Sequence, residues 1–396
     1  MKKLIFSLLF VLCAFFFVGC DENDPEKDPE KDPEKDPVEV KIEINYTYGG
    51  KFSGDADITA KMDGWYSNGT QVVFACGGAI YTSAIEAAKK VEGGKVIGVD
   101  VDQAYIDPII ITSAMKGLQS SVETALGKYF DGKWNEIGGT THKLGLAKEA
   151  DGIDYVGIPT AEDSWRFKSF TKAQYEAVLT KVRADLEVVE QPVGTGAGLT
   201  PGSKIALVTD VGTIDDESFN QAAWQGVKAY GDANSIEYNY YQPSADSKEA
   251  RLTSIGKAIE DGASVVVCPG FLFEEAIYDC QKSYPNVAFI LLDGEPHDAS
   301  YNYETADNVY CVLYQEEQAG FLAGYAAVMD GYTKLGFLGG MSVPAVIRFG
   351  YGFVQGCDYA IQELQGKAPE KLVISSESSA DVKPTVSGYT KVNYID

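Results

Sequence analysis

Short apolar runs alternate with longer segments of mixed polarity along almost the whole chain from residue 38 onward. Apolar runs of four to eight residues are typical of buried strands, and segments whose apolar residues recur every three or four positions are typical of helices. The pattern predicts strands at 40–45, 71–75, 95–100, 108–112, 143–146, 204–210, 235–241, 263–268, 287–292, 308–313 and 334–338. It predicts helices at 81–90, 114–129, 172–187, 218–230, 248–260, 273–283, 315–329 and 345–363. Strands that alternate with helices in this way predict an α/β fold with parallel, doubly wound sheets.

The length of 396 residues predicts two lobes rather than a single core. We expect one lobe mainly from residues 38–190 and the other mainly from 204–340, with 341–365 as the crossover and hinge between them. Residues 191–203 are rich in Gly, Thr and Pro, as in a flexible surface linker. The tail at 366–396 stays unassigned, although KLVISS and TKVNYID could each form a strand.

The first 20 residues have the pattern of a secretion signal, in which Lys2 and Lys3 precede an apolar run at 4–18 that is short for a membrane span. The run ends in FFVGC, which is close to a lipobox and predicts that Cys20 is lipidated. The alternative is an ordinary cleaved signal that leaves Cys20 as a free thiol. Residues 21–37 contain DPEK repeats and predict an extended, disordered tether. The mature protein is therefore expected on the extracytoplasmic side of the cell membrane, held there by a lipid anchor.

The formal net charge of −25 argues against nucleic acid as a partner, because like charges repel. It does not argue against a neutral nucleoside, which carries no phosphate. The cysteines beyond the leader have no close metal-type spacing, so we expect neither a metal site nor another cofactor. A disulfide framework is not expected in a chain of this size, although a single bridge stays open.

The sequence KIALVTDVGTIDDESFNQAAW, near the middle of the chain, carries its most specific pattern. An apolar strand leads into a polar turn with Asp210 and Asp215, and a helix then starts around Ser218, Phe219 and Asn220. Ligands of α/β proteins bind at the carboxyl ends of parallel strands, which is where this turn lies. Carboxylates accept hydrogen bonds from hydroxyls, an amide both donates and accepts, and an aromatic ring offers a flat face. The set suits a ribose joined to a base better than a phosphate, which the neighbouring carboxylates would repel.

The pattern TDxGxxDDxSFNQ in this segment resembles the start of the mature proteins of the basic membrane protein family, the Med/PnrA-like lipoproteins. Members of that family are nucleoside-binding components of ABC uptake systems and have a type I periplasmic-binding-protein fold. The resemblance implies two doubly wound lobes joined by a hinge and no catalytic residues. It also implies an ABC permease as partner, and a purine nucleoside (adenosine, guanosine or inosine) as ligand.

The order of the resembling parts is unusual. In the family the motif lies near the N-terminus, whereas here it begins after residue 200. The preceding part resembles the family's C-terminal half in the stretches YGGKFSGD, VVFACGG, KVIGVDVDQ and TSAMKG, and the part that follows resembles the first half and its crossover. The two halves are therefore expected in circularly permuted order, and joining Ala360 to about Val38 would restore the usual one. Such an exchange is physically permissible, because the termini of compact domains usually lie at the surface.

The resemblance assigns roles to residues near the ends of predicted strands. Phe219 and Phe52 match the two aromatic residues that hold the purine ring between them. Asp293, Asp100 and Lys116 match positions that contact ribose hydroxyls, and Lys116 is expected at the start of a helix. Two carboxylates and an ammonium would form a charged cage for neighbouring hydroxyls.

Other residues of the same turns have less definite roles. Asn220 and Asp210 either lie near the base or shape the first turn, and Arg348 is expected to brace the crossover. The further candidates for ligand contact are Asp215, Ser218, Phe271, Gly77 and Gly78. Each candidate also has a structural interpretation, because a loop Phe often only packs, an Asp after a strand often caps a helix, and glycines often only permit a turn.

Two other classes of function stay open from the sequence. A nucleoside-processing hydrolase could use paired Asp residues as a base or as metal ligands. However, His142 and His297 are the only histidines, and no Gly-x-Ser-x-Gly elbow, Walker loop or zinc signature occurs in the chain. A surface sensor or receptor could reuse the same binding fold, and the sequence does not separate uptake from sensing.

Overall fold

A computed structural model describes residues 41–149, 152–187, 189–194, 196 and 198–395. The predicted signal at 1–20, its Cys20 and the DPEK tether at 21–37 lie outside the described residues.

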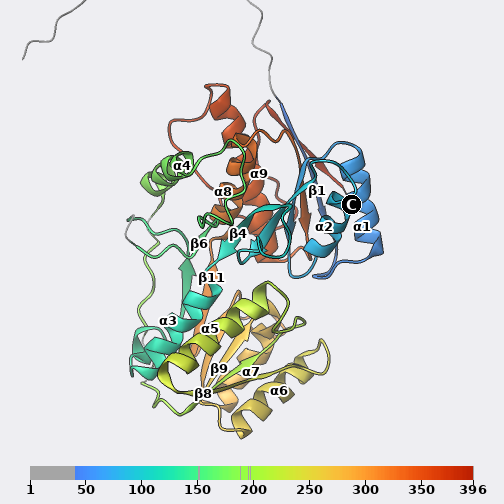
Figure 1. Ribbon diagram of the computed structural model, residues 1–396. Helices are drawn as coiled ribbons and strands as arrows, with labels where there is room; N and C mark the ends of the chain where they lie inside the picture. Colours follow the sequence, from blue (N-terminus) through green and yellow to red (C-terminus); the bar gives the residue numbers. More distant parts are fainter. Residues whose placement is uncertain (1–40, 150–151, 188, 195, 197, 396) are drawn as a thin grey trace, which may run out of the picture. The chain divides into compact units, whose positions relative to one another are not determined.

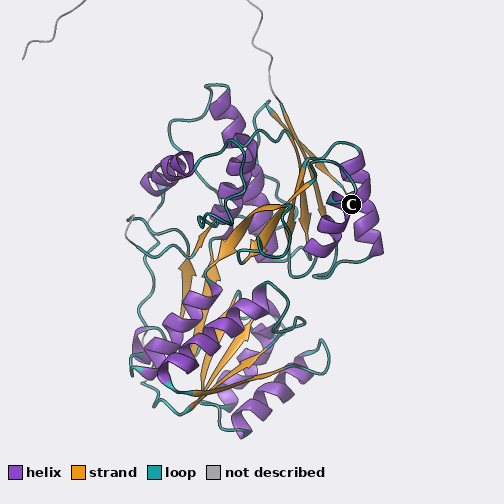
Figure 2. Ribbon diagram, in the orientation of Figure 1, coloured by secondary structure: helices purple, strands orange, loops and turns teal. Residues whose placement is uncertain are grey.

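The observed elements alternate as the sequence predicts (Figures 1 and 2). The strands are β1 (Ile42–Tyr48), β2 (Val72–Cys76), β3 (Lys95–Asp100), β4 (Ile110–Lys116), β5 (Thr140–Leu144), β6 (Val156–Gly157), β7 (Lys204–Val208), β8 (Glu237–Tyr241), β9 (Val265–Pro269), β10 (Ala288–Leu292), β11 (Val309–Tyr314), β12 (Lys334–Gly339) and β13 (Thr390–Tyr394). The α-helices are α1 (Ala56–Ser67), α2 (Tyr81–Ala88), α3 (Leu118–Phe130), α4 (Lys172–Asp185), α5 (Phe219–Asn234), α6 (Lys248–Glu260), α7 (Glu274–Ser283), α8 (Glu316–Met329) and α9 (Pro344–Leu364). Two short 3₁₀ helices are η1 (Trp134–Glu136) and η2 (Phe271–Phe273).

The first sheet has the strand order β13-β1-β12-β2-β3-β4-β6. Its strands pair in parallel except for the short β6, which runs antiparallel to the end of β4. Alternate residues of β2 face opposite sides of the sheet. Val73 and Ala75 pack with α1 and α2, whereas Val72 and Phe74 pack on the side of α8 and α9. Because helices cover both faces, β2 is apolar throughout instead of alternating between apolar and polar residues.

The second sheet has the order β5-β11-β10-β9-β7-β8, and all its strands are parallel. Here Val266 and Cys268 of β9 pack with α6 and α7, whereas Val265 and Val267 pack with α3 and α5. Each sheet therefore has helices on both faces, and the prediction of an α/β fold with two doubly wound parallel sheets is confirmed.

Along its described strands the chain changes sheet four times: after β4, after β5, after β6 and after β11. After β4 it forms α3 and β5, which belongs to the second sheet, and after β11 it forms α8 and β12, which belongs to the first. Residues 140–144 thus join the lobe expected from 204–340, and residues 334–339 join the lobe expected from 38–190. The lobes differ from the expected ranges in this way because the apolar pattern of a strand does not reveal which sheet it joins.

Helix α1 is missing from the elements expected from the sequence, although its signals are present. The Asp55 side chain accepts a hydrogen bond from the Ile58 amide (2.8 Å) and caps the helix. The buried residues Ile58, Met62 and Trp65 follow helical spacing.

The predicted helix at 114–129 begins only at Leu118, which is a correction. Strand β4 continues through Lys116, because Ala114 and Met115 pair with the end of β3 and Lys116 pairs with Val156 of β6. Lys116 therefore ends a strand instead of starting a helix.

Helices α8 and α9 approach each other closely through glycines. A methyl group added at Gly352 or Gly356 of α9 would overlap the backbone of α8. This contact fixes α9 against α8, and it thereby fixes the position of Arg348 and Phe349 in the first turns of α9.

The tail beyond α9 returns to the first sheet. Strand β13 runs parallel to β1 at the sheet edge, and the Ile395 amide donates to the Tyr46 carbonyl (2.8 Å). Asp358 of α9 holds the returning chain by accepting from the Ser387 hydroxyl (2.6 Å). Of the two tail segments considered as strands, TKVNYID contains β13, whereas KLVISS forms no strand.

Candidate ligand-binding site

A cavity of about 590 Å³ lies where the carboxyl ends of strands from both sheets meet. Its lining contains all but one of the residues predicted to contact a ligand: Phe52, Gly77, Gly78, Asp100, Lys116, Asp210, Asp215, Phe219, Asn220, Phe271 and Asp293. The remaining one, Ser218, is buried, and its hydroxyl donates to Asp100 Oδ2 (2.6 Å). The fold therefore gathers the predicted residues at one place, although they come from distant parts of the sequence.

Asp100 and Asp293 occupy corresponding positions at the ends of β3 and β10, one in each sheet. Both have a left-handed backbone, with φ of 65° and 58°, which is uncommon for residues with a Cβ. Such conformations persist where the surrounding structure enforces them, and they concentrate at functional sites. Both side chains are largely buried, so each carboxyl group depends on its protein neighbours for polar contacts.

Lys116 links the two sheets. Its ammonium forms ion pairs with Asp293 and with Glu316 Oε1 (3.2 Å), and it lies 4.9 Å from the centroid of the Phe219 ring. Glu316, the first residue of α8, also pairs with Arg348 Nε of α9 (2.5 Å). Arg348 thus braces the crossover, and the four charged groups form a chain of alternating sign from the second sheet to α9.

Burial disfavours the charge on each member of this cluster, and the neighbours decide the outcome. For Lys116, burial lowers the pKa, but the carboxylates of Asp293, Glu316 and Asp100 outweigh it and raise the pKa above its usual value. For Glu316, burial raises the pKa, but Arg348 and Lys116 outweigh it and keep the pKa below its usual value. Burial is the largest effect on Asp100 and Asp293 and raises the pKa of both. Lys116 therefore remains a charged donor at neutral pH.

The cluster contains an acceptor without a partner. Asp293 Oδ1 is buried and makes no hydrogen bond to any described residue. Buried carboxylate oxygens are normally satisfied, so a donor on a bound ligand is a natural partner for this atom. A carboxylate acceptor beside an ammonium donor matches a pair of neighbouring hydroxyls, each of which donates and accepts.

The turn after β7 is held by its own side chains. The Asp216 carboxylate caps α5 by accepting from the amides of Ser218 (2.9 Å), Asn220 (3.0 Å) and Gln221 (3.1 Å). The Asn220 side chain donates to Asp210 Oδ1 (2.8 Å) and Asp216 Oδ2 (3.0 Å) and accepts from the Asp210 amide (3.2 Å). Of the two roles considered for Asn220 and Asp210, these contacts support the shaping of the first turn.

Phe52 lies against three glycines. A methyl group added at Gly77 or Gly340 would lie 2.9 Å or 2.5 Å from Phe52 Cδ1, and one added at Gly78 would lie 2.7 Å from the Phe52 carbonyl oxygen. Gly77 and Gly78 also have positive φ angles of 142° and 48°. These glycines therefore permit the turn after β2 and also make the space that Phe52 occupies. Phe52 follows β1 of the first sheet, whereas Phe219 follows β7 of the second, and both line the cavity.

Apart from the bracing role of Arg348, the sequence analysis does not predict the contribution of α8 and α9 to the site. Val346 and Phe349 of α9 line the cavity, and Glu316 of α8 holds Lys116. A signal for Glu316 was present, because Glu316 and Glu317 open a helix that is otherwise almost entirely apolar. Buried carboxylates at such a position need a cationic or hydrogen-bonding partner.

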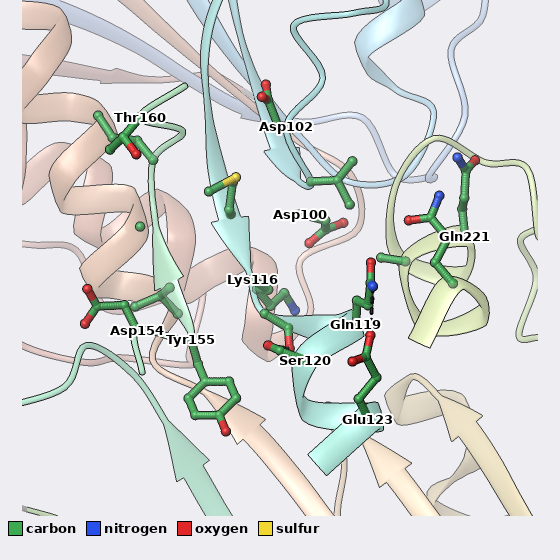
Figure 3. A pocket seen from close by; sticks show the side chains of 18 of the residues that line it. Asp100, Asp102, Lys116, Gln119, Ser120, Glu123, Asp154, Tyr155, Thr160 and Gln221 are labelled. Atoms are coloured by element: carbon green, nitrogen blue, oxygen red, sulfur yellow. Dashed lines mark hydrogen bonds between the residues drawn. The ribbon is translucent and has the colours of Figure 1, made fainter. Parts of the chain in front are cut away.

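A second hollow, of about 1090 Å³, shares part of its wall with the cavity (Figure 3). Of the predicted site residues, only Asp100 and Lys116 line it. Figure 3 shows these two near the centre of its wall, with Gln221 of α5 on one side and Asp154 and Tyr155 on the other. Neither of the two predicted aromatic residues lines this hollow, so the smaller cavity is the better candidate for a ligand with an aromatic ring.

Three further observations concern only the described part of the chain. None of its helices is long and apolar enough to span a bilayer. Its His, Cys, Asp and Glu side chains form no group of three or more that could hold a metal ion. Its cysteines are buried and form no disulfide: Cys76, Cys268, Cys280, Cys311 and Cys357.

Comparison with known protein families points in the same direction as the geometry. The profile of the family described as "ABC transporter substrate-binding protein PnrA-like" matches residues 36–184 and 203–365. The chain belongs to this family. The description is that of binding proteins of transporters rather than of enzymes, which counts against the hydrolase alternative.

Individual relatives resemble part of the chain. They include the "CD4+ T-cell-stimulating antigen" of Listeria monocytogenes, the "ABC transporter nucleoside-binding protein BmpA" of Lactococcus lactis and "Basic membrane protein A" of Borreliella burgdorferi, which are 31%, 30% and 28% identical over 158, 168 and 167 residues. These alignments cover 38%, 41% and 41% of this chain, and 42%, 45% and 46% of the relatives. The chain thus spans less than half the length of these three relatives.

Solved structures that resemble the chain include a solute-binding protein of an ABC transporter system from Aeropyrum pernix K1, with 22% identity, a TM-score of 0.35, and coverage of 41% of this chain and 44% of that one. A periplasmic sugar-binding protein from Legionella pneumophila gives 9% identity, a TM-score of 0.40, and coverage of 75% and 98%.

Proposed function

We propose that this protein is a lipid-anchored, extracytoplasmic substrate-binding protein that captures purine nucleosides and delivers them to an ABC permease. The observation that carries the proposal is the buried cluster of Asp100, Lys116 and Asp293 in a cavity that also contains Phe52 and Phe219. The charged cluster suits the ribose hydroxyls, and the two rings suit the faces of the base. The family description and the Lactococcus relative named as nucleoside-binding support the same ligand class.

The charge of the cavity favours a nucleoside over a nucleotide. Its lining contains many carboxylates and few cations: Asp100, Asp210, Asp215, Asp216, Asp246 and Asp293 against Lys51 and Lys116. The ammonium of Lys116 is already paired with Asp293 and Glu316. A phosphate would meet this surplus of negative charge without a free cation to balance it, whereas a neutral nucleoside would not.

The aromatic residues favour a base over a sugar alone. Phe52 and Phe219 are only partly buried and belong to the lining. Any base can stack on an aromatic ring, and each stacked base contributes about 1–3 kcal/mol to binding. A volume of about 590 Å³ also lies in the usual range for small-molecule sites.

We also infer that the two halves of the family are exchanged in this chain. The three relatives named above align over only 42–46% of their length, as expected if one collinear alignment can follow only one half. Strand β1 lies between β12 and β13, beside the chain that follows α9, which is the neighbourhood that the exchange requires. A re-permuted protein that begins at 204 and joins 360 to 38 should fold and bind the same ligand, and loss of folding would argue against the exchange.

The lipid anchor rests on Cys20 and the apolar run before it. Metabolic labelling with a clickable fatty acid should mark the wild-type protein and leave the Cys20→Ser variant unmarked. Label that persists in the variant, or its absence from both proteins, would contradict the anchor without affecting the ligand proposal.

Titration calorimetry of the purified protein against adenosine, guanosine, inosine and uridine tests the function, with adenosine monophosphate as the charged comparison. Binding of at least one purine nucleoside, with no release of free base and much weaker binding of the monophosphate, is the expected result. Absence of heat with every purine nucleoside, or steady release of base, would overturn the proposal.

A further inference from the structure

Outside the cavity, Glu217 joins the two sheets through both its backbone and its side chain. It lies immediately before Ser218 and α5 of the second lobe. Its carbonyl accepts from Gln103 Nε2 (2.8 Å), and its carboxylate accepts from the Tyr105 hydroxyl. Gln103 and Tyr105 both belong to the connection between β3 and β4 in the first sheet.

Glu217 is also fixed from its own side. Its backbone has a φ of 54°, a left-handed conformation that is strained for a glutamate. Its amide donates to Gln221 Oε1 (2.8 Å), and Gln221 Nε2 donates back to the Glu217 carboxylate (3.1 Å). A strained residue of this kind persists only where its neighbours over-determine it, and two of those neighbours come from the other lobe.

Gln103 is built rigidly into the first lobe. It is fully buried, its Oε1 accepts from the Val99 amide (3.1 Å), and its own amide donates to Ser113 Oγ (3.0 Å). With the side-chain oxygen committed within its own lobe, the Nε2 group is directed to Glu217. Tyr105, by contrast, is 63% exposed and reaches Glu217 with its hydroxyl. The two contacts thus combine a fixed buried donor with an exposed one.

We propose that Gln103 and Tyr105 are positioning residues that clasp Glu217 and thereby hold the first turn of α5, with Phe219, against the cavity. The inference rests on the proposed function, because its purpose is to keep the ring of Phe219 beside a bound base. Phe219 is two residues beyond Glu217, and the intervening Ser218 donates to Asp100 Oδ2 (2.6 Å). The clasp therefore acts on the one segment of the second lobe that carries a predicted aromatic contact and also touches a predicted ribose contact.

The clasp predicts a kinetic effect. Loss of the Tyr105 contact leaves the Glu217 carboxylate with Gln221 and frees the turn to leave its left-handed conformation. Opening of the turn becomes more frequent, and bound ligand leaves faster. For a hydrogen bond to a charged group at a partly exposed position, we expect the dissociation rate to rise about 5- to 20-fold.

The test uses Tyr105→Phe, which removes only the hydroxyl, with Tyr301→Phe as the matched control. Tyr301 is 70% exposed, belongs to the second lobe and does not line the cavity. The first measurement is hydrogen exchange of the ligand-free proteins across residues 215–222. Exchange there should be faster in Tyr105→Phe and unchanged in Tyr301→Phe.

The second measurement is stopped-flow dissociation of whichever purine nucleoside the wild-type protein binds. A faster dissociation rate in Tyr105→Phe alone, with an unchanged melting temperature, supports the clasp. Wild-type exchange at residues 215–222 in Tyr105→Phe would overturn it, whatever the ligand. If the wild-type protein bound no nucleoside, the proposed function would fail, while the exchange measurement would still decide whether the clasp exists.

Gln103→Glu gives an independent check on the buried half of the clasp. The variant keeps the acceptor for the Val99 amide but replaces the donor to the Glu217 carbonyl by an acceptor. Exchange at residues 215–222 should rise further than in Tyr105→Phe, and wild-type exchange would again contradict the proposal. If this variant failed to fold, the Tyr105→Phe result would stand by itself.

Discussion

Lys116, at the end of β4 in the first sheet, forms a buried ion pair with Asp293, which follows β10 in the second. Only 2% of the Lys116 side chain and 9% of the Asp293 side chain are exposed. Removing both charges from water is costly, and their mutual attraction repays this only with good geometry and further hydrogen bonds. The Asp293 Oδ1 atom has no such bond to any described residue, so under the proposed function a bound diol would supply it.

Asp293→Asn should therefore weaken nucleoside binding about 10- to 100-fold, because a charged acceptor becomes a neutral amide. The variant should still fold, since Lys116 keeps Glu316 as its partner. Calorimetry measures the effect, and Asp131→Asn, at an exposed carboxylate paired with Lys133, serves as the control. Equal affinity of Asp293→Asn and wild type would remove Asp293 from the site.

The two rings can be tested separately. Phe219→Ala and Phe52→Ala should each weaken binding of a purine nucleoside by about 1–3 kcal/mol, because each removes one stacking surface. Circular dichroism should show unchanged folding. Tyr303→Ala, at an exposed aromatic residue outside the cavity, should leave the affinity as it is. If neither Phe variant lost affinity, the base would not lie between these rings.

Gly340→Ala tests whether the space that the neighbouring glycines leave for Phe52 matters for binding, without changing Phe52 itself. The new methyl group would lie 2.5 Å from Phe52 Cδ1 and should displace the side chain from its place in the lining. We expect weaker binding of the same order as in Phe52→Ala. Gly388→Ala is the matched control, because nothing lies within 4 Å of its added methyl group. Full affinity in Gly340→Ala would mean that nucleoside binding does not depend on the exact position of the Phe52 ring.

Glu317 should make stability depend on pH. Burial, and then the charge of Glu316, raise the pKa of Glu317 to about 7 from a usual value of 4.5. Between these pH values the folded protein holds a proton on Glu317 that the unfolded chain has released. The stabilisation of the folded state by this proton is therefore fully present below pH 4.5 and is lost as the pH rises through 7. By pH 8 the loss is on the order of 3 kcal/mol.

The variant Glu317→Gln is neutral at every pH and should not show this loss. Thermal denaturation from pH 5 to pH 8 should therefore give a melting temperature that falls less for Glu317→Gln than for wild type. Glu370→Gln, at an exposed carboxylate, should follow the wild-type curve. Parallel curves for Glu317→Gln and wild type would show that the unfolded and folded states hold the Glu317 proton equally.

The sequence predicts the site best where an apolar strand is followed directly by a polar or charged residue. Asp100, Asp210 and Asp293 were all located from apolar runs followed by a carboxylate, because the carboxyl ends of parallel strands gather at one edge of a sheet. The same reasoning, together with the motif after β7, predicts residues of which all but Ser218 lie in the lining of the cavity. None of this required knowledge of which sheet each strand joins.

The remaining features depend on contacts that no local pattern records. The sequence predicts a helix at Lys116, because the segment TSAMKG gives no sign of the pairing between Lys116 and Val156 of β6. Glu316 pairs with Lys116 although the two are 200 residues apart in the sequence. The Tyr105 hydroxyl donates to Glu217, from which it is separated by 112 residues. Membership of β12 in the first sheet follows from a crossover, which apolar periodicity does not encode.

The pairing of strand β1 on both sides has a mechanical consequence when the chain is pulled at residue 41. The described chain begins at residue 41, and β1 is hydrogen-bonded in parallel to β12 on one side and to β13 on the other. A pull on residue 41 along the strand would load both ladders in shear, so that their bonds must break together rather than one after another. Strand β13 thereby holds β1 from a second side, and truncation before Thr390 would leave β12 to resist such a pull alone.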